Sequence, residues 1–228
     1  ELAKSFHVLA PDMIGFGYTE SPTDGIRDKR VWVDHLLGFL DAMQIEKASL
    51  VGNSFGGGLT LAFMIAHPDR VDRAVLMGPA GLEFPITEAL DSVWGYEPSL
   101  EMMRQAIALL ATDPARRTEE LVRSRYEASI RPGAHEPYAA TFGPQPRQNH
   151  IKMLASPEAD IAALPHEVLI LHGKLDPVIP LDVSVRLSNL IPRADLHVFA
   201  QCGHWVQIER AASFNRLVTQ FFQEGLQG

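Results

Sequence analysis

The chain has 228 residues, of which 46% are hydrophobic and 21% are charged, which predicts one packed domain or one domain with an insertion. Its formal net charge of -8 argues against a nucleic-acid partner, because such a partner requires a basic surface. The one cysteine excludes an internal disulfide, no apolar run reaches membrane-spanning length and no signal peptide opens the chain, so we expect a reducing, cytoplasmic setting.

Segments that predict strands alternate along the chain with segments of helical spacing. Residues 7–10 predict a short strand, and the Gly-, Pro- and Asp-rich stretch 11–28 predicts a loop. The further predicted strands are 48–52, 71–77, 168–172 and 196–199, and the predicted helices are 31–43, 57–67, 181–190 and 211–222. This alternation indicates crossover connections and a mostly parallel sheet, which is an α/β fold.

The stretch between residues 78 and 164 breaks this alternation. Helical spacing is clearest in 100–110 and 119–130, prolines interrupt the rest, and no segment predicts a strand convincingly. We therefore expect a helical lid at residues 80–165, inserted into a core domain formed by residues 1–79 and 166–228.

The segment Gly52-Asn53-Ser54-Phe55-Gly56 matches the pattern G-x-S-x-G between a predicted strand and a predicted helix. That context is the one a nucleophile elbow requires, because flanking glycines permit the tight turn that projects the serine hydroxyl. The helix N-terminus places the Phe55 N–H and a positive dipole where an oxyanion would develop. A glycine-rich turn with an incidental serine is the alternative for this pentapeptide taken alone.

Two later loops provide the partners that a catalytic serine needs. Asp176 follows the predicted strand 168–172, and His204 follows the predicted strand 196–199. The carboxyl ends of parallel strands meet at one sheet edge, where such folds place their sites. A histidine base oriented by a carboxylate activates the serine, and the chain order Ser, Asp, His is the order this fold uses. We therefore predict a catalytic triad of Ser54, Asp176 and His204.

The remaining histidines and the cysteine have simpler interpretations. No group of residues has zinc-ligand spacing, so the residues by themselves indicate no zinc site. His172 ends a predicted strand and is expected to pack there. Cys202 lies near His204 in sequence, but we expect its thiol to pack rather than to react.

Further stretches carry a family likeness, namely APDMIGFG (10–17), MGPAG (77–81), FPITEALDSVWGY (84–96), RYEASIRPG (125–133) and HVFAQCGHW (197–205). With the triad motifs, they resemble the α/β-hydrolase fold, and most of all the meta-cleavage product hydrolases of aromatic degradation, in the branch of the 2-hydroxymuconic semialdehyde hydrolases. The resemblance implies a small dienoate substrate, a 2-hydroxy-6-oxo-hexa-2,4-dienoate. It implies enol-to-keto tautomerisation and then hydrolysis of the C5–C6 bond, without a cofactor or metal. The group on C6 is left open.

The resemblance also implies substrate-binding residues. Arg125 matches the family's arginine for the substrate carboxylate, although a solvated helix surface is the alternative from sequence alone. Asn53 and Trp205 match positions that contact the dienoate in the family, with a turn residue and a core residue as their alternatives. His204 would move protons in both steps, and Ser54 would act as nucleophile or would activate water. Homodimers are common in the family, and oligomeric state is left open.

One departure from the family pattern concerns the N-terminal region. In the family, a strand upstream ends in a His-Gly, glycine-rich segment that supplies a second oxyanion N–H, and nothing before His7 matches it. We therefore expect a part of a longer protein whose sheet lacks its N-terminal strands, with a gap between strands 7–10 and 48–52. Losing one oxyanion donor typically costs ~10²–10³ in rate, so we expect slow turnover from this chain.

Two alternatives to a carbon–carbon hydrolase remain open. A serine carboxylesterase of the same fold would use the same triad, so only the lid stretches, Arg125 and Asn53 favour the first reading. A non-catalytic fragment that lacks half of the oxyanion hole is the second alternative. Dehalogenases and epoxide hydrolases are disfavoured, because they use an aspartate nucleophile where this chain has Ser54.

Overall fold

The computed structural model describes residues 1–226 of the chain. Within these residues the strands form one four-stranded sheet in the order β1-β2-β3-β4. The strands are β1 (Ala48–Asn53), β2 (Val71–Met77), β3 (Glu167–Gly173) and β4 (Ala194–Phe199). Each neighbouring pair is parallel, which confirms the predicted parallel sheet.

Helices connect and flank these strands. Those of the core are α1 (Arg30–Ala42), α2 (Phe55–Ala66), α9 (Leu181–Leu190), α10 (Val206–Glu209) and α11 (Ala211–Glu224). Those between β2 and β3 are α3 (Glu88–Trp94), α4 (Leu100–Leu110), α5 (Glu119–Ser129), α6 (His135–Phe142), α7 (Gln148–Leu154) and α8 (Glu158–Ala162). Short 3₁₀ turns occur at η1 (Leu2–Lys4), η2 (Pro68–Arg70) and η3 (Pro114–Arg116). The long periodic helices lie close to their predicted bounds, whereas α3, α6, α7 and α8 were not individually predictable from their proline-interrupted sequence.

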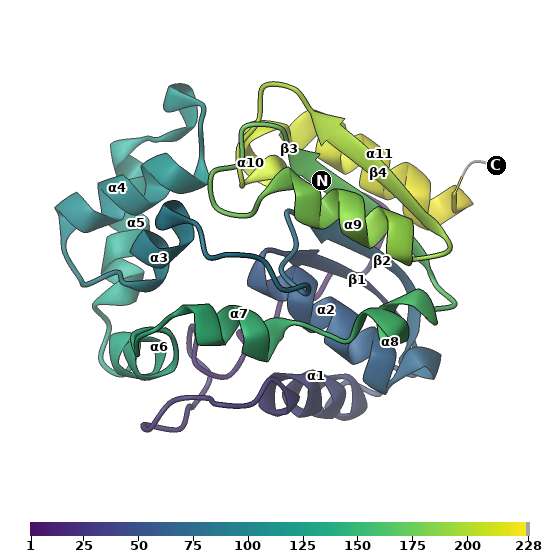
Figure 1. Cartoon of the computed structure of the whole chain (residues 1–228), viewed down its shortest axis with the longest axis horizontal. Coiled ribbons are helices and arrows are strands. Elements are labelled where there is room, and N and C mark those ends of the chain that lie inside the picture. The colour runs from purple at the N-terminus through teal and green to yellow at the C-terminus, as the bar shows by residue number, and fades with distance from the viewer. Residues whose placement is uncertain (227–228) are drawn as a thin grey trace.

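The central strands bury side chains on both faces of the sheet. Along β2, Ala74 and Leu76 point to one cluster of buried residues, and Val75 and Met77 point to the other. Residues of α1, α2 and α9 pack in the first cluster, and residues of α10 and α11 pack in the second. Because successive strand residues face opposite sides, this alternation builds a three-layer sandwich with the sheet in the middle (Figure 1).

The helices between β2 and β3 form the predicted helical insertion. Figure 1 shows α3, α4, α5 and α6 gathered on the left of the molecule, away from the strands. By contrast, α7 and α8 pack against α2 and so cover part of the core. The division of the chain into a core and a lid at residues 80–165 stays a prediction.

Residues 7–10 form no strand, so that prediction is wrong. A strand requires a neighbour for its N–H and C=O groups, and no described strand pairs with this stretch. Val8 is accordingly 49% exposed. Strand β1 lies at an edge of the described sheet, where Val51 is 42% exposed.

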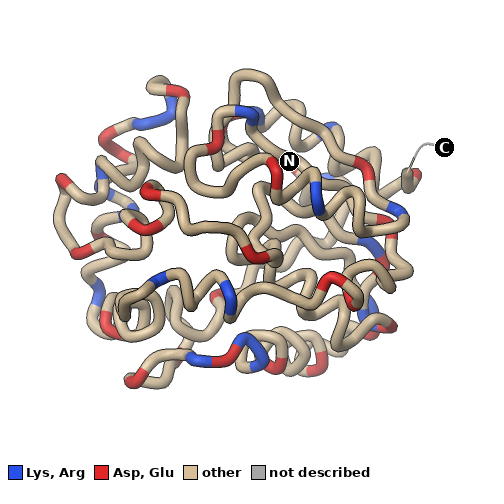
Figure 2. Tube along the Cα trace, viewed as in Figure 1, with Lys and Arg blue, Asp and Glu red and all other residues tan. Residues whose placement is uncertain are grey.

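The charged residues lie mainly on the outer elements. Figure 2 shows Lys and Arg interspersed with Asp and Glu along the surface helices and loops. Among the described residues, no helix has the length and apolar character needed to cross a bilayer.

Candidate active site

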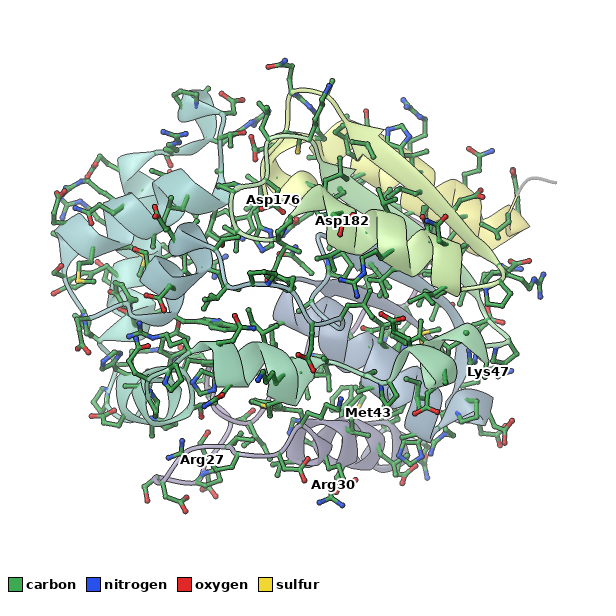
Figure 3. All side chains as sticks on the ribbon, in the orientation of Figure 1. Arg27, Arg30, Met43, Lys47, Asp176 and Asp182 are labelled. Atoms are coloured by element: carbon green, nitrogen blue, oxygen red, sulfur yellow. The ribbon has the colours of Figure 1, made fainter. Side chains whose placement is uncertain are left out.

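The register of the sheet brings the three predicted triad loops to one edge. Asn53 pairs with Met77, Met77 pairs with Leu171, and Gly173 pairs with Phe199. The strand ends are therefore level, and the loops that follow them carry Ser54, Asp176 and His204. Figure 3 shows Asp176 between the sheet and the helices α3–α5, at the side of the core that faces the lid.

Ser54 occupies a strained turn between β1 and α2. Its φ of 56° and ψ of -115° lie outside the regions that residues with a side chain normally adopt. Neighbouring backbone holds this conformation, because Ser54 N donates to Met77 O at 2.9 Å and Ser54 O accepts from Ala80 N at 2.9 Å. This geometry is that of a nucleophile elbow, in which the side chain is held out from the strand end.

Close contacts explain only some of the glycines around this turn. A Cβ on Gly52 would lie 2.3 Å from Gly56 O, and a Cβ on Gly57 would lie 2.5 Å from Pro79 Cβ. A Cβ on Gly56 would meet no atom within 4 Å. The expectation that both flanking glycines of the pentapeptide are sterically required is thus wrong for Gly56, because its side-chain direction points into open space.

Asp176 and His204 form a buried hydrogen-bonded pair. His204 Nδ1 donates to Asp176 Oδ2 at 2.7 Å, and both side chains are 1% exposed. The other carboxylate oxygen, Oδ1, accepts from Val178 N at 2.8 Å and Ile179 N at 3.0 Å. These bonds fix the tautomer of His204, so its Nε2 is the ring atom left to act as a base.

The residue after β2, Gly78, lies against this pair. A Cβ on Gly78 would lie 3.0 Å from Asp176 Oδ2 and 3.1 Å from His204 Nδ1, so the backbone passes directly beside the pair. Among the hydrogen bonds of residues 1–226, none joins Ser54 Oγ to His204. The Asp–His half of the candidate triad is therefore formed, whereas no hydrogen bond joins Ser54 to His204 among the described residues.

A second histidine, His172, lies against Asp176, and sequence analysis missed this contact. His172 is fully buried, with Nε2 3.1 Å from Ile179 O and Nδ1 2.6 Å from Ser184 Oγ. Because a carbonyl only accepts, Nε2 carries the proton and Nδ1 accepts from the serine hydroxyl. Burial lowers the pKa of His172, so the ring is neutral at this position. The buried, strand-ending position of His172 hinted at packing alone, and Ser184 had no sequence signal.

The predicted substrate residue Asn53 bonds to the protein itself. Its Nδ2 donates to Met77 O at 2.9 Å and lies 3.5 Å from His204 O. Its Oδ1 lies 3.5 Å from Gln207 Nε2, a contact that the sequence did not suggest. The Asn53 side chain thus links the end of β1 to the loop that holds His204.

The lid residue Arg125 reaches the loop of His204. Arg125 lies on α5, and its guanidinium carbon is 5.9 Å from the centroid of the Trp205 ring. Such a cation–π contact orients the guanidinium while leaving its donors available. The structure therefore brings together two predicted substrate residues that are far apart in the sequence, and Trp205 is the neighbour in sequence of His204 of the candidate triad.

The first residue of α2, Phe55, joins the elbow to an aromatic cluster. Its ring lies 4.7 Å from that of Trp32, 5.4 Å from Phe16 and 6.1 Å from Phe142, measured between centroids. Phe142 belongs to the lid helix α6, so this cluster anchors both the elbow and the lid. As the first helical residue, Phe55 also has an N–H without an acceptor inside the helix, as an oxyanion donor requires.

The thiol near His204 has the properties of a packed group. Cys202 is fully buried, and burial, with the Glu209 charge as the next cause, raises its pKa to about 12. A thiol in this state is not a nucleophile near neutral pH. Among the described residues, no group of three or more His, Cys, Asp or Glu is arranged to hold a metal ion.

Comparisons with known proteins identify the family of the chain. The alpha/beta hydrolase fold family matches residues 1–211. The chain is 58% identical to a 2-hydroxymuconate semialdehyde hydrolase of Pseudomonas sp. (strain CF600), covering 98% of the chain and 79% of the relative. It is 51% identical to a 2-hydroxy-6-oxo-2,4-heptadienoate hydrolase of Pseudomonas putida, covering 97% of the chain and 80% of the relative.

A solved structure supports the same assignment. A meta-cleavage product hydrolase from Pseudomonas fluorescens IP01, a mutant complexed with acetates, superposes with a TM-score of 0.95 at 53% identity. The match covers 99% of this chain and 82% of that one. The likeness thus extends over nearly all of the chain, lid included. The chain belongs to the α/β-hydrolase fold family and, within it, to the meta-cleavage product hydrolases.

Proposed function

We propose that this protein hydrolyses the C5–C6 bond of 2-hydroxy-6-oxo-hexa-2,4-dienoates that carry hydrogen or a small alkyl group on C6. The relatives that are 58% and 51% identical are named for 2-hydroxymuconate semialdehyde and for the heptadienoate homologue. The reaction adds water across the C5–C6 bond and releases 2-hydroxypenta-2,4-dienoate and a small carboxylic acid. It belongs to the degradation of aromatic compounds.

The observation that carries this proposal is the site formed by core and lid together. The Asp176–His204 pair and the strained Ser54 lie at one sheet edge, and Arg125 of the lid lies against Trp205, the residue after His204. A triad alone supports any serine hydrolase. An arginine held over the ring of Trp205 adds a partner for the carboxylate that every substrate of this class carries.

His204 has a role in both halves of the proposed reaction. With Nδ1 bonded to Asp176, its Nε2 accepts the proton of the substrate enol and returns a proton to C5 in forming the ketone. In the second half the same atom accepts a proton from Ser54 or from a water molecule that attacks the C6 carbonyl, and it returns this proton to the dienoate fragment as the C5–C6 bond breaks. Asp176 stabilises the imidazolium that forms at each stage.

Ser54 and Phe55 act on the C6 carbonyl. The strained turn holds the Ser54 hydroxyl out from the strand end, and the Phe55 N–H begins α2, where the helix dipole favours negative charge. Attack on C6 therefore develops an oxyanion beside a fixed donor. Asn53 and Trp205 are proposed to line the dienoate, with Asn53 also holding the loop of His204.

The decisive experiment follows the loss of visible absorbance of 2-hydroxymuconic semialdehyde and of its 6-methyl analogue, because these dienolates are coloured. We expect turnover that is abolished in Ser54→Ala, with both products identified by chromatography. A nitrophenyl ester serves as the comparison substrate. Turnover of the ester with neither dienoate cleaved would establish an esterase instead. If neither the dienoates nor the ester were consumed, the protein would be non-catalytic.

The proposal extends to setting and assembly. We place the reaction in the cytoplasm, with the dienoate as the small-molecule partner, a homodimer as the assembly to test and no role for nucleic acid. Size-exclusion chromatography with light scattering measures the assembly directly. A monomer at micromolar concentration would contradict the homodimer and leave the chemistry unaffected.

A further inference from the structure

A buried carboxylate lies between the lid and the loop of the catalytic histidine. Glu209, at the end of α10, is 3% exposed. Its Oε2 accepts from Thr112 Oγ1 at 2.8 Å and from Asp113 N at 2.9 Å, and both donors follow lid helix α4. Its Oε1 accepts from Gly203 N at 2.9 Å, and Gly203 directly precedes His204. One side chain therefore bonds to two segments that are far apart in the sequence.

Backbone contacts reinforce this junction. Trp205 N donates to Leu110 O at 3.0 Å, so the residues on both sides of His204 are bonded into the junction. A Cβ on Gly203 would lie 2.7 Å from Thr112 Cγ2, which shows how closely the two segments approach. On the lid side, the Arg117 guanidinium donates to Ala111 O and to Thr112 O, each at 2.7 Å, and so stabilises the segment that carries Thr112.

The chemistry of these bonds requires a carboxylate. Each donor is an N–H or O–H group that points at Glu209, and a carboxylate offers two oxygens that only accept. An amide at this position would offer one oxygen and would turn an NH₂ donor toward one of the existing donors. Glutamine would therefore retain the size of the side chain but break one side of the junction.

We infer that Glu209 is a positioning residue that couples the lid to His204. Through its bonds, the position of the lid segment after α4 and the position of the loop that carries His204 depend on each other. This inference rests on the proposed function for the role of His204. It predicts that a change on the lid side of the junction is transmitted to the loop that carries His204. A carboxylate that merely stabilised the fold would show no such transmission.

The test compares variants on the two sides of the junction. Glu209→Gln retains volume, Thr112→Val removes the lid-side hydroxyl at constant shape, and Thr112→Ser retains the hydroxyl. We expect the first two to lower kcat on the dienoate about 5- to 50-fold at a temperature well below their melting temperatures, and Thr112→Ser to restore most of it. The double variant should be less impaired than the product of the single effects, because both act through one junction.

Ile161→Val is the matched control for lost stability, since Ile161 is fully buried in α8, away from the junction. It should lower the melting temperature and leave kcat unchanged. If Glu209→Gln likewise lowers only the melting temperature, the role of Glu209 is structural and the inference fails.

Hydrogen exchange measured by mass spectrometry provides a readout that needs no substrate. Thr112→Val should speed exchange in peptides that contain residues 203–205 as well as in those that contain 110–113. Faster exchange confined to 110–113 would overturn the coupling. Failure of the proposed function gives a different result. In that case Thr112→Val still speeds exchange in residues 203–205, but the wild type shows no Ser54-dependent loss of the dienoate.

Discussion

His172 Nε2 lies 3.4 Å from Asp176 Oδ2, the same carboxylate oxygen that accepts the bond from His204 Nδ1. The carboxylate of the candidate triad is therefore held between two imidazole rings. Burial lowers the pKa of His172, so the second ring is neutral and does not compete with His204 as a cation. The ring of His172 thus packs against the carboxylate and restricts its direction.

The support that Ser184 gives to His172 can be removed without touching the triad. Ser184→Ala leaves the buried Nδ1 of His172 without its 2.6 Å donor, so we expect the free energy of unfolding to fall by about 1–3 kcal/mol. Because Asp176 loses part of its orientation, kcat should fall several-fold with little change in KM. Urea unfolding and steady-state kinetics measure the two effects. Unchanged stability would show that the hydroxyl is not a required partner of the ring.

The glycines of the elbow should differ sharply in their tolerance of a methyl group. Gly52→Ala brings a Cβ to 2.3 Å from Gly56 O, and overpacking of this kind typically costs about 1–3 kcal/mol or more. Gly56→Ala meets no atom within 4 Å and lies in α2, where alanine is favoured by up to about 1 kcal/mol. Urea unfolding of the two variants forms a matched pair, and equal effects would contradict the geometry of the turn.

Arg125 should contribute to substrate binding and little to stability. Arg125→Met removes charge-assisted hydrogen bonds worth about 1.5–3 kcal/mol, so we expect KM for the dienoate to rise about 10-fold or more. Since Arg125 is exposed, the free energy of unfolding should change by less than about 0.5 kcal/mol. Arg123→Met, an exposed change on the same helix, is the control and should leave KM unaltered. Equal KM values for the two variants would remove Arg125 from the site.

Stability should depend on pH through buried histidines. Burial lowers the pKa of His150, with the charges of Arg27 and Arg147 as further causes, and burial also lowers the pKa of His172. The unfolded chain then binds these protons more readily, so this part of the stability is present above the unfolded-state pKa of about 6.5 and is lost as pH falls below it.

A substitution of His150 tests the pH dependence of stability without changing the candidate triad, because His150 lies outside it. Its ring makes an edge-to-face contact with Trp94, and its Nε2 lies 3.1 Å from Pro144 O. His150→Gln retains a donor for that carbonyl but does not titrate. Between about pH 8 and pH 5.5 the variant should lose less unfolding free energy than the wild type. Parallel loss in the two proteins would show that His150 does not contribute to the pH dependence.

Local pattern was sufficient to predict the candidate triad. Ser54 lies in a pentapeptide whose conformation depends on its own strand-to-helix turn, and Asp176 and His204 each follow a short apolar strand. Parallel strands bring their carboxyl ends to one edge, so strand position alone placed these residues at the same edge. The register of the sheet confirms that prediction. The fold class followed in the same way from the alternation of strands and helices.

Contacts between distant segments could be decided only by the tertiary structure. Residues 7–10 have the composition of a strand, yet a strand exists only where a neighbour accepts its hydrogen bonds. Sequence pattern also treated Gly52 and Gly56 alike, because the space around a side chain depends on what packs against it. The junction of Glu209 with Thr112 and Gly203 had no local signal for the same reason. Sequence by itself determined the fold class and where the candidate reactive groups lie along the chain, whereas the structure alone decided which other residues hold them.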